Sequence, residues 1–235
     1  MKIKLFTIPN LITLGNLFCG SVGSVLTVAH ICGENYSLAL PFYLMLGSAL
    51  LDFCDGFAAR LLHQYSEVGK ELDSLADVVS FGLLPSLLFM ALFLEMGGTP
   101  AWSLVALIVV LFSALRLAKF NIDDTQHEEF EGLPTPAAAI FCLSLAALCE
   151  QHNLVIALEW LLLLSVLIAA LLVSPIRMFS LKFKSWGLRD RDNRMRYAFL
   201  MTSLLLIILC KLYAVPAIIV LYIVISTVRW TFKKS

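Results

Sequence analysis

The sequence predicts an all-α integral membrane protein with about eight transmembrane helices. Of its 235 residues, 60% are hydrophobic and only 14% are charged, and the mean hydropathy is +0.89. Soluble domains carry about 25% charged and 45–50% apolar residues, so the departure is large. Several apolar runs reach the roughly 20 residues that span a bilayer. We expect helices because a lipid-exposed backbone must satisfy its own hydrogen bonds.

Eight apolar segments are the expected spans, and a range of six to eight allows for the short ones. They lie near residues 11–29, 39–62, 73–94, 101–118, 135–150, 154–173, 197–212 and 214–229. The last two could instead form one re-entrant pair. The basic opening before an apolar run also suggests a signal peptide. Because Asn10, Thr13 and Asn16 interrupt that run, we expect a retained first span. Residues 1–235 are expected to form a single membrane domain.

The placement of Lys and Arg predicts that both termini face the cytosol. With the N-terminus inside, the basic residues gather on the cytosolic side and only Lys211 falls outside. The expected location is a cytoplasmic membrane of prokaryotic type. A basic loop at about residues 175–196 then faces the cytosol, where it either sets the topology or attracts anionic headgroups. The six cysteines form no CxxC pair, so neither a disulfide framework nor a zinc site is expected.

Four aspartates stand out in this apolar chain. Asp52 and Asp55 are spaced i, i+3, and Asp73 and Asp77 are spaced i, i+4, so each pair shares a helix face. If the second and third spans are adjacent antiparallel helices, all four carboxylates converge. Such a cluster must be protonated, paired with cations or neutralised by metal. Carboxylates without His or Cys favour Mg²⁺ or Mn²⁺, and two ions would suit a displacement at phosphorus.

Residues around the aspartates suit a phosphate ligand. Gly56 and Gly69 each lie one helical turn from an aspartate and would let a ligand approach the backbone closely. Arg60 shares a face with Gly56 and can reach a phosphate. Two alternatives remain: interfacial acids paired with Arg60 and Lys70, or the ion pathway of a cation- or proton-coupled transporter.

The full pattern resembles the motif of the CDP-alcohol phosphatidyltransferase family. It reads Asp52-x2-Asp55-Gly56-x2-Ala59-Arg60-x8-Gly69-x3-Asp73-x3-Asp77. Members are membrane enzymes that transfer a phosphatidyl or related group from a CDP-linked lipid to an alcohol, releasing CMP. The resemblance implies a homodimer, four metal-ligating aspartates, and Asp77 as the general base as well. It also implies contacts to the CDP-lipid from Asn10 and Thr13, in an element similar to the family's PNxxT, and from Gly56, Ala59, Arg60, Ser66 and Gly69.

Other segments resemble the phosphatidylserine synthase branch of that family. They are IPNLITLGNLFCG at the first span, ALRLAKFN at 114–121, FEGLPTPAAA at 130–139 and VSPIRMFSLK at 173–182. This likeness implies transfer of the phosphatidyl group from CDP-diacylglycerol to L-serine, giving phosphatidylserine and CMP. Another acceptor, glycerol 3-phosphate or inositol phosphate, is the alternative within the family.

The serine carboxylate calls for a cation near the cytosolic end of the fourth span. Arg116 and Lys119, beside Asn121, are the predicted serine-binding residues, although the two cations also suit the simple end of a span. Glu131, with its neighbours at 127–129, is expected in a solvated loop rather than as a ligand. The Gly132-Leu133-Pro134 stretch is expected to turn beside the site.

Overall fold

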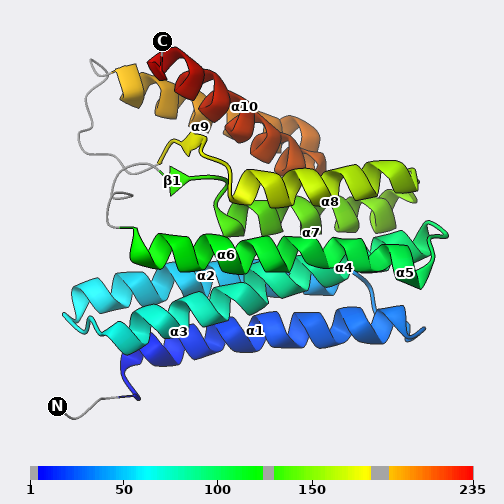
Figure 1. Ribbon diagram of the computed structural model, residues 1–235, viewed down its shortest axis with the longest axis horizontal. Coiled ribbons are helices and arrows are strands. Elements are labelled where there is room, and N and C mark those ends of the chain that lie inside the picture. Colours follow the sequence, from blue (N-terminus) through cyan, green and yellow to red (C-terminus); the bar gives the residue numbers. More distant parts are fainter. Residues whose placement is uncertain (1–4, 124–129, 181–190, 235) are drawn as a thin grey trace.

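The computed structural model describes residues 5–123, 130–180 and 191–234, which are mostly helical (Figure 1). The described helices are α1 (Ile8–Ile31), α2 (Ala39–Leu61), α3 (Glu67–Asp77), η1 (Val78–Leu83), α4 (Leu84–Glu95), α5 (Pro100–Ser103), η2 (Leu104–Leu107), α6 (Ile108–Ile122), α7 (Thr135–His152), α8 (Leu158–Leu172), α9 (Arg191–Cys210), η3 (Lys211–Tyr213) and α10 (Ala214–Lys234). Each of the eight expected spans coincides with one of these helical stretches. The predicted all-α fold is confirmed.

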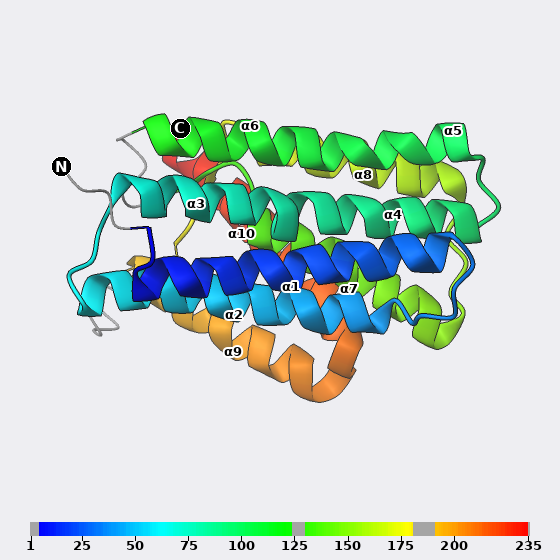
Figure 2. The same ribbon diagram turned by 90° about the horizontal axis from the view of Figure 1, so that it is seen from below.

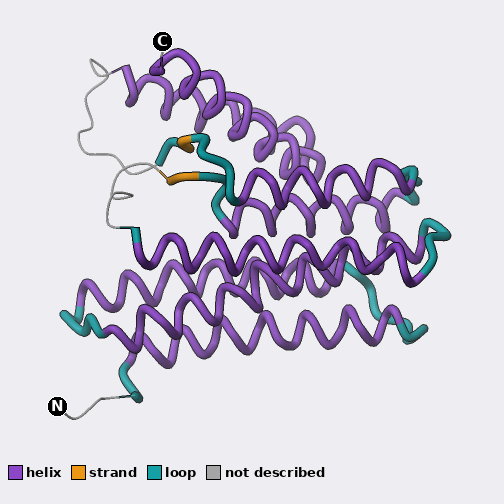
Figure 3. Tube along the Cα trace, viewed as in Figure 1, coloured by secondary structure: helices purple, strands orange, loops and turns teal. Residues whose placement is uncertain are grey.

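Five stretches of the described helices are long and apolar enough to cross a membrane. They are Ile8–Ile31, Ala39–Leu61, Glu67–Glu95, Pro100–Ile122 and Asn193–Phe232. The last reverses direction at η3, where Lys211 has a φ of 49°, so that α9 and α10 form a hairpin (Figure 3). α8 is a shorter apolar helix. The chain is therefore an integral membrane protein.

Local sequence signals set the start of the two helices that begin near the aspartates. The Thr7 hydroxyl accepts the backbone N–H of Asn10, and Pro9 occupies the first turn of α1, where its missing N–H costs nothing. The Ser66 hydroxyl accepts the backbone N–H of Gly69 at 3.0 Å and caps α3. These caps fix where each helix begins and hence which face its later polar residues share.

α1 forms the common wall behind the aspartates. It packs along α2 and also contacts α3, η1 and α4 (Figure 2). The second and third spans are antiparallel as predicted, but both lie against α1. Small residues bring α1 close to its neighbours, since a Cβ at Gly23 would lie 2.9 Å from the Leu84 side chain. α1 thereby holds the two halves of the aspartate motif in a fixed relation.

The core lies between α4 and α7. Phe81, Phe89 and Phe93 from η1 and α4 are buried against a face of α7 that is rich in small residues. That face carries Ala138, Ala139, Cys142 and Ala146. Small side chains let helices approach closely inside a membrane, where packing replaces the hydrophobic effect as the driving force.

A short two-stranded sheet corrects the expectation of an unstructured stretch after α6. β1 (Phe130–Glu131) pairs antiparallel with β2 (Arg177–Met178). Glu131 is therefore part of a strand, and its carboxylate pairs with Lys119 at 2.5 Å rather than lying free in a solvated loop. Gly132 turns beside this strand with a φ of +75°. Residues 127–129 lie outside the described residues.

The basic segment at 175–196 is likewise more structured than a loop. It contains β2 and the first turns of α9, and residues 181–190 lie outside the described part of the chain. The backbone carbonyl of Phe179, just after β2, accepts a hydrogen bond from the buried Tyr222 hydroxyl of α10 at 2.9 Å. This bond joins the C-terminal hairpin to the small sheet.

Candidate functional site

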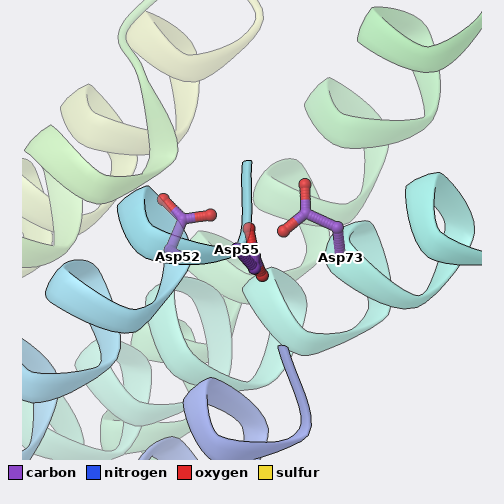
Figure 4. A group of neighbouring side chains, drawn as sticks. All are labelled: Asp52, Asp55 and Asp73. Atoms are coloured by element: carbon purple, nitrogen blue, oxygen red, sulfur yellow. The ribbon is translucent and has the colours of Figure 1, made fainter. Parts of the chain in front are cut away.

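Three of the four aspartates converge at one end of the bundle. Asp52 and Asp55 reach from α2 and Asp73 from α3, and one carboxylate oxygen of each lies within 4.8 Å of the other two (Figure 4). Asp55 is only 6% exposed, and one oxygen of Asp73 is buried with no hydrogen-bond partner among the described residues. An all-oxygen donor set in this compact arrangement fits a divalent cation of the Mg²⁺ or Mn²⁺ type.

Asp77 lies one helical turn further along α3. It is 8% exposed and stands outside the group of three, yet the charges of Asp52 and Asp73 act on it. One of its oxygens accepts a hydrogen bond from the side-chain amide of Asn16 at 3.4 Å. The predicted convergence therefore holds for three carboxylates, and the fourth occupies an adjoining, more buried position.

A π-helical turn begins directly after Asp77. The N–H of Leu84 donates to the carbonyl of Val79, five residues earlier, instead of following the α-helical pattern. Pro85 contributes to this irregularity because it has no N–H to donate. Such turns are frequent at functional sites. Here the turn lets α3 direct Asp73 and Asp77 toward α2, while α4 directs its phenylalanines into the core.

α1 contributes a direct ligand to the cluster. The Thr13 hydroxyl donates to Asp55 Oδ2 at 2.6 Å in a buried environment. Hydrogen bonds to an ionised acceptor are stronger than neutral ones and fix the direction of the carboxylate. Thr13 therefore orients one of the three convergent aspartates.

An open pocket adjoins the three carboxylates. Residues from α1, α2, the α2–α3 loop and α3 line it, namely Pro9, Asn10, Thr13, Asp55, Gly56, Ala59, Gln64, Tyr65, Ser66, Gly69, Lys70 and Asp73. Six of the seven residues predicted to contact the CDP-lipid are in this lining. The seventh, Arg60, is exposed beside it, since a Cβ at Gly56 would lie 3.9 Å from the Arg60 guanidinium. Gly69 is tightly enclosed, because a Cβ there would lie 3.0 Å from Asn10 Oδ1.

The structure separates the three predicted serine-binding residues. Arg116 is 7% exposed, donates from Nη1 to Thr135 Oγ1 at 2.7 Å, and interacts electrostatically with Asp77. Lys119 is paired with Glu131, as described above. The Asn121 side-chain amide donates to Ser74 Oγ at 2.8 Å and so links α6 to α3. Arg116 is thus the member of the set that lies next to the aspartates.

Some residues at the site were not in the predicted set. Gln64, Tyr65 and Lys70 line the pocket, and Asn16 contacts Asp77. The first three fall in or near the variable interval of the motif, where spacing alone gives no signal. Asn16 follows Thr13 by three residues, so the two share a helix face, and this spacing was the available signal.

These features define a helical membrane protein with a carboxylate site for divalent cations at one end of its bundle, beside an open pocket. The chain belongs to the CDP-alcohol phosphatidyltransferase family, whose sequence model matches residues 6–172. This match covers the aspartates, the pocket and Arg116, and it ends with α8.

Similar proteins extend the likeness to the C-terminal hairpin. A Helicobacter pylori protein named CDP-diacylglycerol–serine O-phosphatidyltransferase is 32% identical over 232 residues, which cover 97% of this chain and 92% of the relative. Proteins of the same name from Bacillus subtilis and Saccharomyces cerevisiae are 39% and 34% identical, over 58% and 61% of this chain and 72% and 54% of the relatives. The three named organisms include bacteria and a yeast.

Proposed function

We propose that the chain is an enzyme that transfers the phosphatidyl group from CDP-diacylglycerol to the hydroxyl of L-serine, forming phosphatidylserine and releasing CMP. The observation that carries this proposal is the position of Asp77, which lies between the three-carboxylate group and the buried Arg116. A base, a cation for a carboxylate and a site for phosphate-bound metal are thereby contiguous. Family membership and the printed name of the similar proteins support the same reaction.

The CDP portion of the donor is assigned to the open pocket. Gly56, Ala59 and Gly69 leave room for a ligand next to the backbone, which larger side chains would fill. Ser66 and Asn10 offer polar groups at the same wall. Arg60 is beside the pocket and Lys70 is in its lining, and both can meet phosphate oxygens. The acyl chains of the donor would remain in the surrounding lipid.

Asp52, Asp55 and Asp73 would hold the metal, with Asp77 as a further ligand, and two Mg²⁺ or Mn²⁺ ions would suit this number of carboxylates. Bound ions would offset the charge of the diphosphate and of the leaving CMP. The Thr13 hydrogen bond keeps Asp55 directed toward the cluster. The unpartnered oxygen of Asp73 is an expected position for a metal ligand.

The transfer itself needs a base and a fixed acceptor. Asp77 takes the proton of the serine hydroxyl as that oxygen forms a bond to the lipid-side phosphorus of CDP-diacylglycerol. The bond from this phosphorus to the bridging oxygen breaks, and CMP leaves with the electron pair. Arg116 holds the serine carboxylate, because its guanidinium is buried, positively charged and adjacent to Asp77.

We also propose that the site faces the cytosol. Arg60, Lys70, Lys119 and Arg177 belong to the end of the bundle that carries the aspartates, and both ends of the described chain lie there too (Figure 1). Lys211 is at the opposite end, in the turn between α9 and α10. This asymmetry follows the positive-inside rule. A homodimer of single-domain protomers, each with its own site, completes the proposal.

The test is acceptor-dependent release of CMP by the purified protein. CDP-diacylglycerol and Mn²⁺ or Mg²⁺ are supplied with L-serine, glycerol 3-phosphate or inositol phosphate in parallel. Release with L-serine alone, abolished by chelation of the metal, is the expected result. Release with a phosphorylated acceptor would keep the family reaction and overturn serine. Ion flux in proteoliposomes without CMP release would favour a transporter.

A further inference from the structure

Buried polar atoms without partners gather around Asp77. Within the described part of the chain, six buried side-chain nitrogen or oxygen atoms have no hydrogen-bond partner, and three of them are Asn16 Oδ1, Asp73 Oδ1 and Arg116 Nε. Each of these three residues interacts with Asp77, through a hydrogen bond or through charge. Buried polar groups in native proteins are nearly always satisfied. This concentration at one carboxylate indicates a ligand that supplies the missing partners.

The direction of the Asn16 amide follows from its neighbour. Asn16 is completely buried, and its Nδ2 donates to Asp77 Oδ1 at 3.4 Å. An ionised carboxylate can only accept, so the amide nitrogen faces Asp77 and the carbonyl oxygen is directed elsewhere. That oxygen is the unpartnered acceptor.

The backbone around Asn16 holds this arrangement in place. Its own backbone carbonyl accepts the hydroxyls of Ser48 from α2 and Ser80 from η1, each at 3.1 Å. Both hydroxyls are completely buried. The position of Asn16 is thus fixed at the junction of three helical elements, and its side chain is presented to Asp77 from a rigid backbone.

The three groups around Asp77 differ in what they can bind. A guanidinium only donates hydrogen bonds, a carbonyl oxygen only accepts them, and Asp77 between them can take a proton. An acceptor that carries a carboxylate, an ammonium group and a hydroxyl would satisfy all three. Of these groups, only the ammonium can satisfy Asn16 Oδ1 while the carboxylate is on Arg116 and the hydroxyl on Asp77.

We propose that Asn16 binds the ammonium group of the acceptor amino acid through Oδ1, and that it thereby selects L-serine over hydroxy acids that lack this group. The proposal rests on the proposed function. It adds a specificity-determining residue on α1, across the site from Arg116 on α6. The selection arises because an acceptor without the ammonium leaves the Asn16 oxygen buried and unpaired.

The experiment compares L-serine with 3-hydroxypropionate, which keeps the carboxylate and the hydroxyl but has no ammonium group. The ratio of the two kcat/KM values is measured for CMP release by the full chain and by an Asn16→Leu variant of similar side-chain size. We expect the ratio to fall about 10- to 100-fold in the variant, the value of one hydrogen bond to a charged group. Binding of CMP with Mn²⁺, measured by calorimetry, should stay unchanged.

Ser48→Ala is the matched control, because it removes a hydrogen bond to the same residue without touching its amide. It should leave the acceptor ratio unchanged. If Asn16→Leu does not fold, Asn16→Ala provides the same comparison. An unchanged ratio in a folded, active variant overturns the assignment of Asn16 alone. Absence of serine-dependent CMP release by the unaltered protein overturns the proposed function, and the assignment falls with it.

Discussion

A single methyl group at Gly20 should disturb both the stability and the activity of the protein. A Cβ at this position would lie 2.2 Å from Ser80 Oγ and 2.7 Å from the backbone Cα of Ser80. To reach the 3.4 Å at which ordinary contact begins, α1 and η1 would have to separate by about 0.7 Å. Overpacking of this kind costs about 1–3 kcal/mol.

The same displacement would reach the chemistry. Gly20 lies one helical turn after Asn16, and Ser80 lies three residues after Asp77, so the shift acts on the hydrogen bond between Asn16 and Asp77. A misplacement near 1 Å can cost about 100-fold in rate. We therefore expect Gly20→Ala to lower Tm in detergent and to lower kcat/KM for CMP release by about 100-fold.

Two further variants sharpen the result. Gly47→Ala on α2 is the control, because a Cβ there meets nothing within 4 Å, and it should be neutral or stabilising by up to about 1 kcal/mol. Adding Ser80→Ala to Gly20→Ala removes the contact with Oγ but not the one with the backbone, so recovery should be small. Unchanged Tm and kcat/KM for Gly20→Ala would refute the close packing of α1 on η1.

Three other changes should have separable effects. Gly132→Ala should destabilise the protein by at least about 2 kcal/mol in a thermal scan, because φ is +75° and a Cβ would lie 2.2 Å from the Leu172 carbonyl oxygen. Thr13→Val should raise the metal concentration for half-maximal activity about 10- to 100-fold, whereas Thr13→Ser should restore it, because the hydroxyl orients a predicted metal ligand. Glu150→Gln should lower Tm by a few degrees and leave every KM unchanged, since its carboxylate accepts two backbone N–H groups at the start of α2, far along that helix from the aspartates.

The helices and the aspartate group could be predicted because their signals are local. Apolar length marks a span, and a spacing of three or four residues places side chains on one face. Asp52 and Asp55 follow this rule on α2, and Asp73 follows it on α3. The order and type of the elements therefore needed no knowledge of tertiary contacts.

Helix rotation and side-chain pairing were beyond the reach of spacing. The π-helical turn after Asp77 changes the rotation of α3 relative to α4, and no apolar period reveals it. Lys119 and Arg116 are both basic residues at one end of α6, but only the tertiary structure shows that Glu131 pairs with the first while the second is buried beside Asp77. Asn16 escaped notice for the same reason, since its value depends on an unpartnered oxygen.

The most direct test of the account is phosphatidylserine formation by the Asp77→Asn variant, measured beside the unaltered protein with CDP-diacylglycerol, L-serine and Mn²⁺. Asparagine keeps the size of the side chain but cannot take the proton. The account predicts that the unaltered protein forms phosphatidylserine and CMP in equal amounts, and that the variant still binds CMP with Mn²⁺ but loses at least about 100-fold in rate. Near-normal formation of phosphatidylserine by the variant, or none by the folded unaltered protein, would contradict it.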